Sequence, residues 1–478
     1  MLVISIEYDS RKVKKGSSFV AITGEKSDGH SFIEAAINKG ATKIIADQAR
    51  KDELEALVKK YKAVEFLFVA DTRDELARLS AEAAGNPSNK LKVIGITGTN
   101  GKTTVTHLIQ AIFASKRPCA LLGTMGLKKT VSDTYLDLGN TTPQSKEIQD
   151  IMGDLLKENF EYLAMEVSSH AVDQKRTAYI NFKSFAVTNL TQDHLDYHVT
   201  MNNYFKAKAE ALKQVSDCVV LNADDEYFEE FKKEAEKQKL KIITVSINKD
   251  ANYQARNISY DESGLSYDLI KDGSKLLRVS LKLNGTFNVF NSMFAIVLAL
   301  NEGMTVSELE EVLPRLEPVA GRFEVIQSES SPMCIVDYAH SPDGLENVLQ
   351  GARELLKLGA KLVCLFGCGG DRDITKRPKM AKIAYELSDF VFVTSDNPRT
   401  EDPEQIVADI LTGIPEMSKV KVVIDRRTAI QEAIQSCSKE DILVIAGKGH
   451  EDYQIIGETK IHFDDREEVR SVILSVTK

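Results

Sequence analysis

The sequence predicts an α/β protein of three domains, and three observations support this prediction. The chain has 478 residues, which suggests three domains at about 150 residues each. In the middle and C-terminal regions, short apolar runs alternate with helix-compatible runs, a pattern typical of mostly parallel sheets covered by helices. Clusters of polar residues follow the apolar runs, at the strand ends where such sheets bind ligands.

The first region, residues 1–88, predicts a small N-terminal α/β domain. Strand-like runs at residues 18–22, 43–46 and 64–69 are separated by helix-compatible segments. The turn-rich sequence Gly85-Asn86-Pro87-Ser88 ends this pattern. We therefore expect a domain boundary at residue 88.

The second region, residues 89–318, predicts a central parallel sheet with helices on both faces. Its strand-like runs are residues 91–96, 162–167, 184–190, 218–222 and 240–245, and helices are expected at residues 147–158 and 202–212. The third region, residues 319–478, repeats the alternation and predicts a Rossmann-like, doubly wound sheet. Its strand-like runs are residues 333–336, 361–366, 389–394, 420–424 and 441–446.

A glycine-rich loop follows the first strand of the central region and predicts a nucleotide triphosphate site. Its glycines leave backbone N–H groups free to converge on phosphate, Lys102 adds a cation, and Thr103 adds a hydroxyl suited to Mg²⁺. The spacing departs from the strict P-loop pattern, because Ile96 stands where the first glycine is expected and Gly95 lies one residue upstream. A plain strand-to-helix turn is the alternative, but the strand before the loop and the helix-compatible run at residues 102–114 favour a P-loop-type domain. The predicted phosphate-binding residues are Gly98, Thr99, Asn100, Gly101, Lys102, Thr103 and Thr104.

Composition and charge exclude several classes of function. The net charge of -10 leaves no basic stripe for nucleic acid. The apolar run at residues 1–6 is too short for a signal peptide, and no segment reaches the ~20 apolar residues of a membrane span. We expect a cytoplasmic protein without membrane or nucleic-acid partners. Cys364 and Cys368 form the one close cysteine pair, which favours buried thiols over a zinc site.

Three residues of the central region predict a metal site. Glu166 closes one strand, His194 lies in the loop after another, and Thr103 belongs to the phosphate loop. A carboxylate, an imidazole and a hydroxyl at neighbouring strand ends can hold Mg²⁺ against triphosphate oxygens. The alternatives are a helix cap for Glu166 and a structural histidine for His194, and the acidic residues around His194 favour the ligand.

Eight motifs in order along the chain resemble those of the Mur ligase family, and they cover the sequence end to end. They are TGTNGKTT at residues 97–104, Asn140-Thr141-Thr142, Glu166-Val167-Ser168-Ser169-His170, Asn189-Leu190-Thr191-Gln192-Asp193-His194, Lys206-Ala207-Lys208, residues 288–291, Gly321-Arg322-Phe323-Glu324 and Asp337-Tyr338-Ala339-His340. Members of this family use ATP to join an amino acid to a UDP-linked peptide during bacterial peptidoglycan synthesis. Asp9-Ser10-Arg11 and Asp396-Asn397-Pro398-Arg399 resemble the MurE branch.

The resemblance implies roles for further residues. Those implied to contact the rest of ATP are Asn288, Asn291, Arg322 and Asp337. Those implied to grip a UDP-N-acetylmuramoyl dipeptide are Ser10, Asn140, Thr141, Thr142, Ser168, Gln174 and Arg176, which suit an anionic substrate. The implied magnesium ligands are Thr103, Glu166, His194 and Lys208, and the catalytic set is Lys102, Glu166, His194 and Lys208. Lys208 matches a lysine that the family carries as an N-carbamate formed from carbon dioxide; from the sequence alone it would be a solvated helix lysine.

The incoming amino acid is implied to bind in the third region. Arg372, Arg399 and Glu451 offer two planar cations and a carboxylate for an amino acid with a distal carboxylate and ammonium. The family uses the Asp-Asn-Pro-Arg form for meso-diaminopimelate, and an unpaired buried arginine would be costly without that carboxylate. A surface turn and L-lysine as substrate are the alternatives. The expected amino-acid site is Arg372, Asp396, Asn397, Pro398, Arg399, Gly447 and Glu451.

The implied reaction forms an acyl phosphate from the dipeptide's D-glutamate carboxylate and ATP, and the amine of the amino acid then displaces phosphate. We expect a monomer whose third domain closes onto the second when ligands bind. Two rival functions are a folylpolyglutamate synthase-like ligase and a nucleotide-dependent switch ATPase. One departure from the family is the short lead-in before Asp9, which predicts a differently built or more open uridine pocket.

Overall fold

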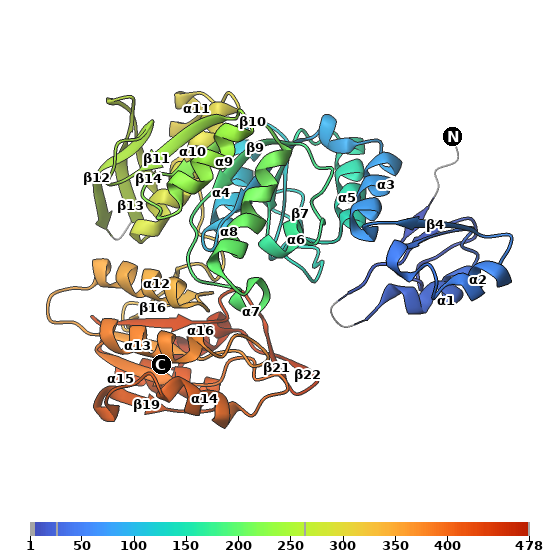
Figure 1. The fold of residues 1–478 in the computed structure, drawn as a ribbon. Helices are drawn as coiled ribbons and strands as arrows, with labels where there is room; N and C mark the ends of the chain where they lie inside the picture. The colour runs from blue at the N-terminus through green and yellow to red at the C-terminus, as the bar shows by residue number, and fades with distance from the viewer. Residues whose placement is uncertain (1–4, 25–26, 262–263, 477–478) are drawn as a thin grey trace.

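A computed structural model describes residues 5–24, 27–261 and 264–476, and within them the chain forms three α/β regions, each built around its own main sheet (Figure 1). The N-terminal sheet has four parallel strands in the order β1-β2-β3-β4. They are β1 (Ile6–Glu7), β2 (Ser18–Val20), β3 (Lys43–Asp47) and β4 (Glu65–Val69), with helices α1 (Ile33–Asn38) and α2 (Glu55–Lys60) between them. The predicted strands at residues 18–22, 43–46 and 64–69 are confirmed to within two residues.

Helix α3 (Thr72–Ala83) connects the N-terminal sheet to the central region. Asp71 begins it by accepting hydrogen bonds from the backbone N–H groups of Arg73 and Asp74 at 2.9 and 3.1 Å. Leu76 and Leu79 pack on the N-terminal sheet. The same helix packs along α5 (Ser145–Lys157) of the central region, as Figure 1 shows. The division at residue 88 and the one at residue 318 stay predictions.

The central sheet has ten strands in the order β14-β13-β12-β11-β10-β9-β5-β8-β6-β7. Strands β12, β11, β10, β9, β5, β8 and β6 pair in parallel, while the β12-β13-β14 and β6-β7 pairs are antiparallel. The strands are β5 (Lys92–Thr97), β6 (Cys119–Gly123), β7 (Gly126–Lys128), β8 (Tyr162–Glu166), β9 (Phe182–Val187), β10 (Val215–Asn222), β11 (Lys241–Ser246), β12 (Tyr253–Asp261), β13 (Gly264–Lys271) and β14 (Ser274–Leu281). The parallel part matches the prediction, and the antiparallel strands at both edges are additions to it.

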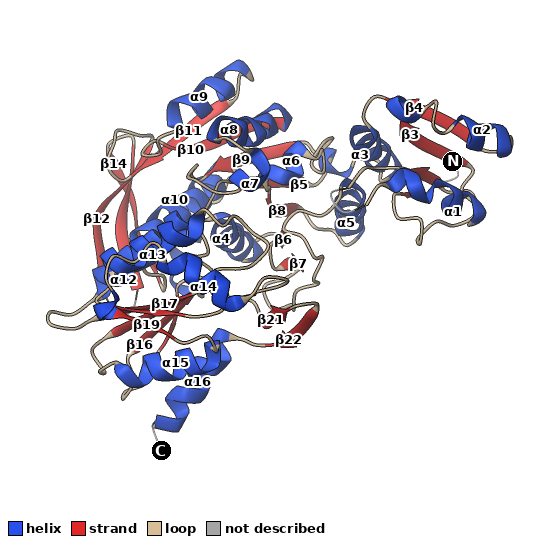
Figure 2. Cartoon of the chain, turned by 60° about the horizontal axis from the view of Figure 1, so that its bottom comes forward, coloured by secondary structure: helices blue, strands red, loops and turns tan. Residues whose placement is uncertain are grey.

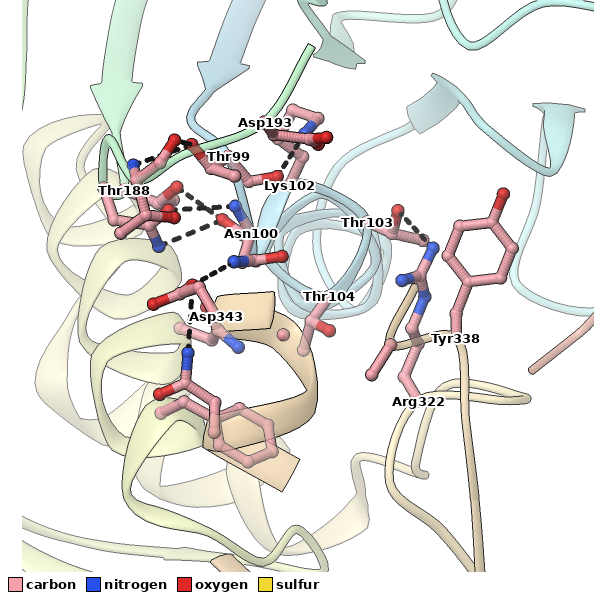
Figure 3. Close-up of a pocket in the computed structure, with 18 of the residues that line it drawn as sticks. Thr99, Asn100, Lys102, Thr103, Thr104, Thr188, Asp193, Arg322, Tyr338 and Asp343 are labelled. Carbon is pink, nitrogen blue, oxygen red and sulfur yellow. Dashed lines mark hydrogen bonds between the residues drawn. The ribbon is translucent and has the colours of Figure 1, made fainter. Parts of the chain in front are cut away.

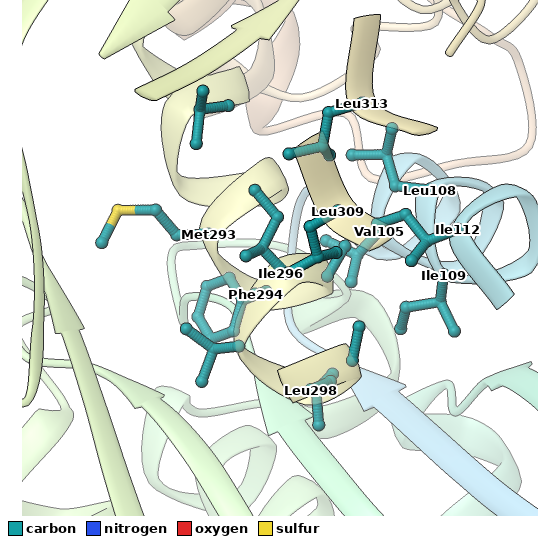
Figure 4. Close-up of a cluster of buried hydrophobic side chains, with 14 of the residues drawn as sticks. Val105, Leu108, Ile109, Ile112, Met293, Phe294, Ile296, Leu298, Leu309 and Leu313 are labelled. Carbon is teal, nitrogen blue, oxygen red and sulfur yellow. The ribbon is translucent and has the colours of Figure 1, made fainter. Parts of the chain in front are cut away.

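Helices cover both faces of the central sheet, because the side chains of its strands alternate between two apolar cores. Ile94 and Ile96 of β5 face helices α4 and α10, whereas Val93 faces the other side. Figure 4 shows α4 and α10 packed together through residues such as Ile109 and Phe294. The helices are α4 (Lys102–Ala114), α6 (Ser169–Asp173), α7 (Leu195–His198), α8 (Met201–Glu210), α9 (Phe228–Lys237), α10 (Thr286–Asn301) and α11 (Val306–Val312).

The C-terminal sheet has six strands in the order β15-β16-β20-β17-β18-β19, of which the last five are parallel. Helices α12, α13 and α14 cover one face and α15 and α16 the other (Figure 2), so the predicted doubly wound sheet is confirmed. The strands are β15 (Glu324–Ile326), β16 (Met333–Asp337), β17 (Leu362–Phe366), β18 (Phe390–Val393), β19 (Val420–Val422) and β20 (Ile442–Ala446), and a separate hairpin is formed by β21 (Tyr453–Ile456) and β22 (Thr459–His462). The helices are α12 (Pro342–Leu355), α13 (Lys376–Leu387), α14 (Pro403–Leu411), α15 (Arg426–Ser436) and α16 (Asp465–Val476).

Two further predictions concern membranes and cysteines. Within the described ranges, the structure holds no helix that is both long and apolar enough to cross a membrane. All six cysteines are free thiols, and five of them are buried, including Cys364 and Cys368. The expected buried thiols are confirmed at those two positions.

Candidate active site

A cavity of about 460 Å³ lies where the carboxyl ends of the central strands meet the C-terminal region. The phosphate loop and α10 form its central-region walls, and α12 with the loop after β16 closes it from the other region (Figure 3). Of the predicted residues, the cavity is lined by Thr99, Asn100, Gly101, Lys102, Thr103, Thr104, Thr141, Glu166, Ser168, His194, Lys208, Asn291, Arg322 and Asp337. The motifs expected to bind ATP and magnesium therefore converge on one space.

The phosphate loop is held in shape by close contacts that only glycine permits. Gly98 has φ +148°, and a Cβ there would lie 1.8 Å from the Thr188 hydroxyl oxygen. Gly101 has φ +87°, and a Cβ would lie 2.4 Å from Oδ1 of Asn291. The backbone N–H of Asn100 donates to the side-chain oxygen of Asn189 at 2.9 Å. The loop joins β5 to α4, which is the strand–loop–helix context expected of a phosphate site.

Two lysines, the half-buried Lys102 and the buried Lys208, converge on one carbonyl oxygen of this loop. Lys102 Nζ donates to the carbonyl oxygens of Gly98 and Thr99 at 2.9 and 2.8 Å, and Lys208 Nζ donates to that of Gly98 at 2.8 Å. Burial lowers the pKa of Lys102, while Glu166 partly offsets it. The side chain of Lys208 is only 1% exposed, and burial together with Lys102 lowers its pKa well below the usual value. The reading of Lys208 as a solvated lysine, made from the sequence alone, is wrong.

The Glu166 carboxylate lies fully buried at the end of β8. It accepts hydrogen bonds from the backbone N–H and the hydroxyl of Thr124, both at 3.0 Å, and from the hydroxyl of Thr103 at 3.2 Å. The helix-cap alternative for Glu166 is wrong, because Ser168 caps α6. Gly123 leaves the room for this carboxylate, since a Cβ there would lie 2.2 Å from Oε1 of Glu166.

His194 stands beside an acidic neighbour at the mouth of the site. Its backbone is left-handed, with φ +53°, and Asp193 accepts its N–H at 2.9 Å while the other carboxylate oxygen lies 3.4 Å from Nε2. The rings of His170 and His194 lie edge to face, 4.8 Å apart. Desolvation lowers the pKa of His194, although Asp193 opposes the shift, and this favours the neutral imidazole that can bind a metal.

The residues expected to contact the rest of the nucleotide lie on α10, in the loop before β15 and at the end of β16. Asn291 faces the cavity and donates to Oδ1 of Asn288 at 2.9 Å, whereas Asn288 does not line the cavity in the part of the chain that the structure describes. The Arg322 guanidinium stacks 4.4 Å from the ring centre of Tyr338 and donates to the Thr103 hydroxyl at 3.1 Å. Asp337 accepts two backbone N–H groups at 2.7 Å, and burial raises its pKa.

Most residues expected to grip the UDP-linked dipeptide form one hydrogen-bonded group next to the cavity. Arg176 donates to Oε1 of Gln174 at 2.6 Å and to the carbonyl oxygen of Thr142 at 3.0 Å. The Thr142 hydroxyl in turn accepts the N–H of Ser168 at 3.2 Å. Thr141 and Ser168 reach the cavity itself, whereas Asn140 and Ser10 lie away from it in the described part of the chain. Arg73 of α3, which sequence reasoning missed, also donates to Gln174, at 3.3 Å.

The residues expected to bind the amino acid form a separate polar group on three loops of the C-terminal region. Asn397 donates to the Glu451 carboxylate at 2.9 Å, and Gly447 passes so close that a Cβ would lie 3.1 Å from Oδ2 of Asp396. Arg399, half-buried with φ +52°, donates to the carbonyl oxygen of Gly370 at 2.7 Å. It forms no ion pair with any described residue.

The remaining two members of this set differ in their surroundings. Arg372 is exposed and donates to the carbonyl oxygen of Asp371 at 3.1 Å. Pro398 is buried, and its carbonyl oxygen would lie 2.0 Å from a Cβ at Gly370, so the two loops run in contact. The loop that carries Arg399 is not a free surface turn, because the backbone N–H of Arg399 donates to the carbonyl oxygen of Ile455 in β21 at 3.1 Å, and the N–H of Gly370 donates to that of Asn397 at 2.9 Å.

Sequence reasoning also missed residues of the nucleotide cavity. Asn100 in the phosphate loop donates to the carboxylate of Asp343 in α12, so the two regions touch across the cavity (Figure 3). Asp343 lies in the first turn of its helix, where acidic residues are common for reasons of the helix dipole, and nothing in the sequence distinguishes it. Thr124, which holds Glu166, likewise follows a short strand without any motif.

Comparison with known proteins shows one family along the whole chain. Three family models match: Mur ligase family, catalytic domain, at residues 3–83; Mur ligase middle domain at residues 96–299; and Mur ligase, glutamate ligase domain, at residues 321–449. A relative from Syntrophomonas wolfei named UDP-N-acetylmuramoyl-L-alanyl-D-glutamate–2,6-diaminopimelate ligase is 42% identical over 97% of this chain and 93% of its own. One of the same name from Clostridium botulinum is 41% identical over 98% and 95%.

Solved structures agree in fold. One described as the structure of UDP-N-acetylmuramoyl-L-alanyl-D-glutamate–2,6-diaminopimelate ligase has a TM-score of 0.70 at 33% identity, over 99% of this chain and 95% of that one. A folylpolyglutamate synthase of Mycobacterium tuberculosis, solved with ADP and AMPPCP, has a TM-score of 0.65 at 18% identity and covers 84% of this chain and 96% of its own. The latter shares the fold alone.

Proposed function

Since the chain belongs to the Mur ligase family and is an ATP-dependent amide ligase, we propose that it adds meso-diaminopimelate to UDP-N-acetylmuramoyl-L-alanyl-D-glutamate in peptidoglycan biosynthesis. The observation that supports this substrate is Arg399. Its guanidinium is half-buried, forms no ion pair with any described residue, and shares its loop with Asn397, which holds Glu451. A distal carboxylate of the amino acid would pair with Arg399, and the distal ammonium with Glu451.

The residues around Glu166 fit a magnesium ion. A buried carboxylate, the Thr103 hydroxyl and a neutral His194 imidazole are oxygen and nitrogen donors that face the cavity. Among the described residues no three acidic, histidine or cysteine side chains form a metal cage, so triphosphate oxygens would supply further ligands, as is usual for Mg²⁺. Bound Mg²⁺ would offset the negative charge that gathers on the transferred phosphoryl group.

Lys208 fits the N-carbamate that the family resemblance implies. Its amine is fully buried, and its pKa is held low by burial and by Lys102, which favours the uncharged amine. The uncharged amine is the form that adds to carbon dioxide. The resulting carbamate would be a carboxylate-like oxygen donor beside the phosphate loop and could hold a second Mg²⁺.

The chain's own residues then perform two displacements. The γ-phosphoryl group of ATP would lie over the N-terminus of α4, where loop N–H groups and Lys102 stabilise its charge while the D-glutamate carboxylate attacks. This step forms the acyl phosphate and ADP. The amine of diaminopimelate, held by the C-terminal region, attacks the acyl carbon through a tetrahedral intermediate, loses its proton and expels phosphate. Arg322 links the regions because it reaches Thr103 from the C-terminal side.

Three alternative functions differ from the proposed one in the substrates that they would need. L-Lysine would leave Arg399 without a carboxylate, and a folylpolyglutamate synthase-like activity, suggested by the shared fold, gives no role to the N-terminal region matched at residues 3–83. A switch ATPase needs no amino acid at all. We further propose that the enzyme acts in the cytoplasm as a monomer.

The test is phosphate release from ATP with the UDP-linked dipeptide and meso-diaminopimelate, L-lysine or no amino acid. Release that depends on diaminopimelate is expected. Release with L-lysine would retain the ligase and refute the specificity, release without amino acid would indicate a switch, and light scattering of the same sample would measure the oligomeric state.

A further inference from the structure

Lys448 is a fully buried lysine at the centre of the amino-acid site, and the reaction described above gives it no role. Its side chain is 0% exposed, and it lies in the loop after β20. Its ammonium donates to Oδ1 of Asn397 at 3.1 Å and to Oδ1 of Asp396 at 3.3 Å, and lies 3.5 Å from Oε2 of Glu451. Burying an ammonium group costs free energy unless polar groups pair with it, as these three side-chain oxygens do here.

The contacts of Lys448 decide how Asn397 presents its amide. The Asn397 oxygen accepts from Lys448 and from the backbone N–H of Ile455 at 2.9 Å, so its nitrogen must point to the other side, where it donates to Glu451 at 2.9 Å. A flipped amide would place an N–H₂ group against the ammonium. The lysine therefore fixes one orientation of Asn397, and through it one position of the Glu451 carboxylate.

The ammonium also balances two neighbouring carboxylates. Burial and the charge of Asp396 raise the pKa of Glu451, and Lys448 opposes this shift. Although burial opposes it, Lys448 and then Arg426 hold the pKa of Asp396 below its usual value. With the lysine in place, both carboxylates can stay ionised, which a site for an ammonium group requires.

A different residue already ties the two loops together. Arg426 pairs with Asp465 at 2.7 Å, and both side chains are fully buried. The guanidinium donates to the carbonyl oxygen of Ala446 at the end of β20, at 3.1 Å, and to that of Ser395 after β18, at 3.5 Å. Arg426 thus connects the backbones of both loops. The contacts of Lys448 are with side chains, so its role is to orient them.

We propose that Lys448 is a positioning residue for amino-acid recognition: it orients Asn397 and keeps Glu451 available for the distal ammonium of the incoming amino acid. This inference rests on the proposed function, because it assumes that these loops bind the amino acid. It assigns Lys448 no contact with ATP or with the UDP-linked dipeptide.

The test compares the Michaelis constants of all three substrates in Lys448→Met and in the matched control Lys460→Met. Lys460 is exposed and lies over the same Tyr453 ring, 3.8 Å from its centre, compared with 5.7 Å for Lys448. The loss of charged hydrogen bonds in Lys448→Met is expected to raise KM for diaminopimelate about 10-fold to 100-fold. The KM values for ATP and the dipeptide should stay within about twofold of wild type, and Lys460→Met should change none of the three.

Two further variants keep the inference falsifiable. Lys448→Gln retains a donor without the charge and should give a smaller rise in KM than Lys448→Met. If neither variant folds, Asn397→Ala breaks the same link from the other side, and the same selective rise in KM is expected. Equal changes in all three KM values, or a fall in kcat alone, would overturn the inference. If wild type uses L-lysine, the proposed substrate is wrong, and the KM comparison still tests Lys448 with L-lysine.

Discussion

Asn100 of the phosphate loop and Asp343 of α12 form a hydrogen bond across the nucleotide cavity, although 243 positions separate them in the chain. The Asp343 carboxylate also accepts from Asn347 on its own helix, at 3.1 Å. A residue that would lie next to ATP phosphates is thus in direct contact with the region that we propose to bind the amino acid. We expect this contact to be one of those that hold the third domain against the second when the domains close.

Asp343→Ala should raise KM for ATP several-fold, because closure over the nucleotide loses one of its contacts. Asp343→Asn keeps an oxygen acceptor and should be closer to wild type. Small-angle scattering with and without ATP should show a less compact Asp343→Ala protein. Equal compactness of wild type and variant in both states would contradict the role of this contact.

Arg399→Ala should raise KM for diaminopimelate about 10-fold to 100-fold, the loss expected for a charged, bidentate hydrogen bond to a carboxylate. The measurement is steady-state phosphate release at saturating ATP and dipeptide. The matched control is Arg427→Ala, because Arg427 is an exposed arginine of the same region that pairs with Glu468. An unchanged KM in Arg399→Ala would remove the argument for diaminopimelate.

Gly123→Ala should reduce kcat/KM at least about 100-fold with little loss of stability. The backbone of Gly123 is not in the left-handed region, so its only obstacle is the 2.2 Å approach of the new Cβ to Glu166. The carboxylate must then move away from Thr103. Phosphate release at increasing magnesium concentration and a thermal unfolding curve are the two measurements. Normal activity would mean that Glu166 does not need this position.

Gly153→Ala should stabilise the protein by about 0.5–1 kcal/mol, because glycine is unfavourable inside a helix. Gly153 lies in α5, and a Cβ there would meet only the Cβ of Ala84, at 3.9 Å. Activity should be unchanged, so this variant also serves as the glycine-to-alanine control for Gly123. The thermal midpoint measures the gain, and a fall in it would show that α3 and α5 pack more tightly than this spacing indicates.

His340 should make stability fall between about pH 6.5 and pH 4. Burial and then Lys376 lower its pKa from 6.5 to about 4, so in this window the unfolded chain takes up a proton that the folded protein does not. The contribution is fully present above pH 6.5 and is lost as the pH falls through about 4. Thermal midpoints of wild type and His340→Gln at pH 7.5, 6 and 5 should differ in slope, with the variant flatter. Parallel slopes would assign the pH dependence to other groups.

Much of the fold followed from apolar periodicity, because buried parallel strands are near-continuous apolar runs. The predicted helix at residues 102–114 has those bounds in the structure. The hairpins β12-β13-β14 were missed, although Asp272-Gly273, both with positive φ, is a strong hairpin signal between two strands. Buried and exposed residues follow one another irregularly in β13 and β14, at the edge of the sheet. This weakens the alternation of apolar and polar residues that would have identified the strands.

The candidate site also contains residues that the sequence could predict and residues that it could not. Residues at strand ends, such as Glu166, follow from parallel topology, which brings those ends together. Lys208 could not be placed from periodicity, because a lysine on an amphipathic helix normally reaches solvent, whereas here it is buried against the phosphate loop. The roles of Asp343 and Lys448 depend on contacts between regions and between loops. Such contacts leave no local pattern in the sequence.

Helix α3 serves two partners at once, since Leu76 completes the core of the N-terminal sheet while the helix also lies along α5. A shortened chain that begins after residue 88 would uncover the α5 surface, and one that begins at Thr72 would bring Leu76 and Leu79 into water. We therefore expect the first two regions to fold as one cooperative unit, and a dissection of this protein into fragments should cut between the central and C-terminal regions instead.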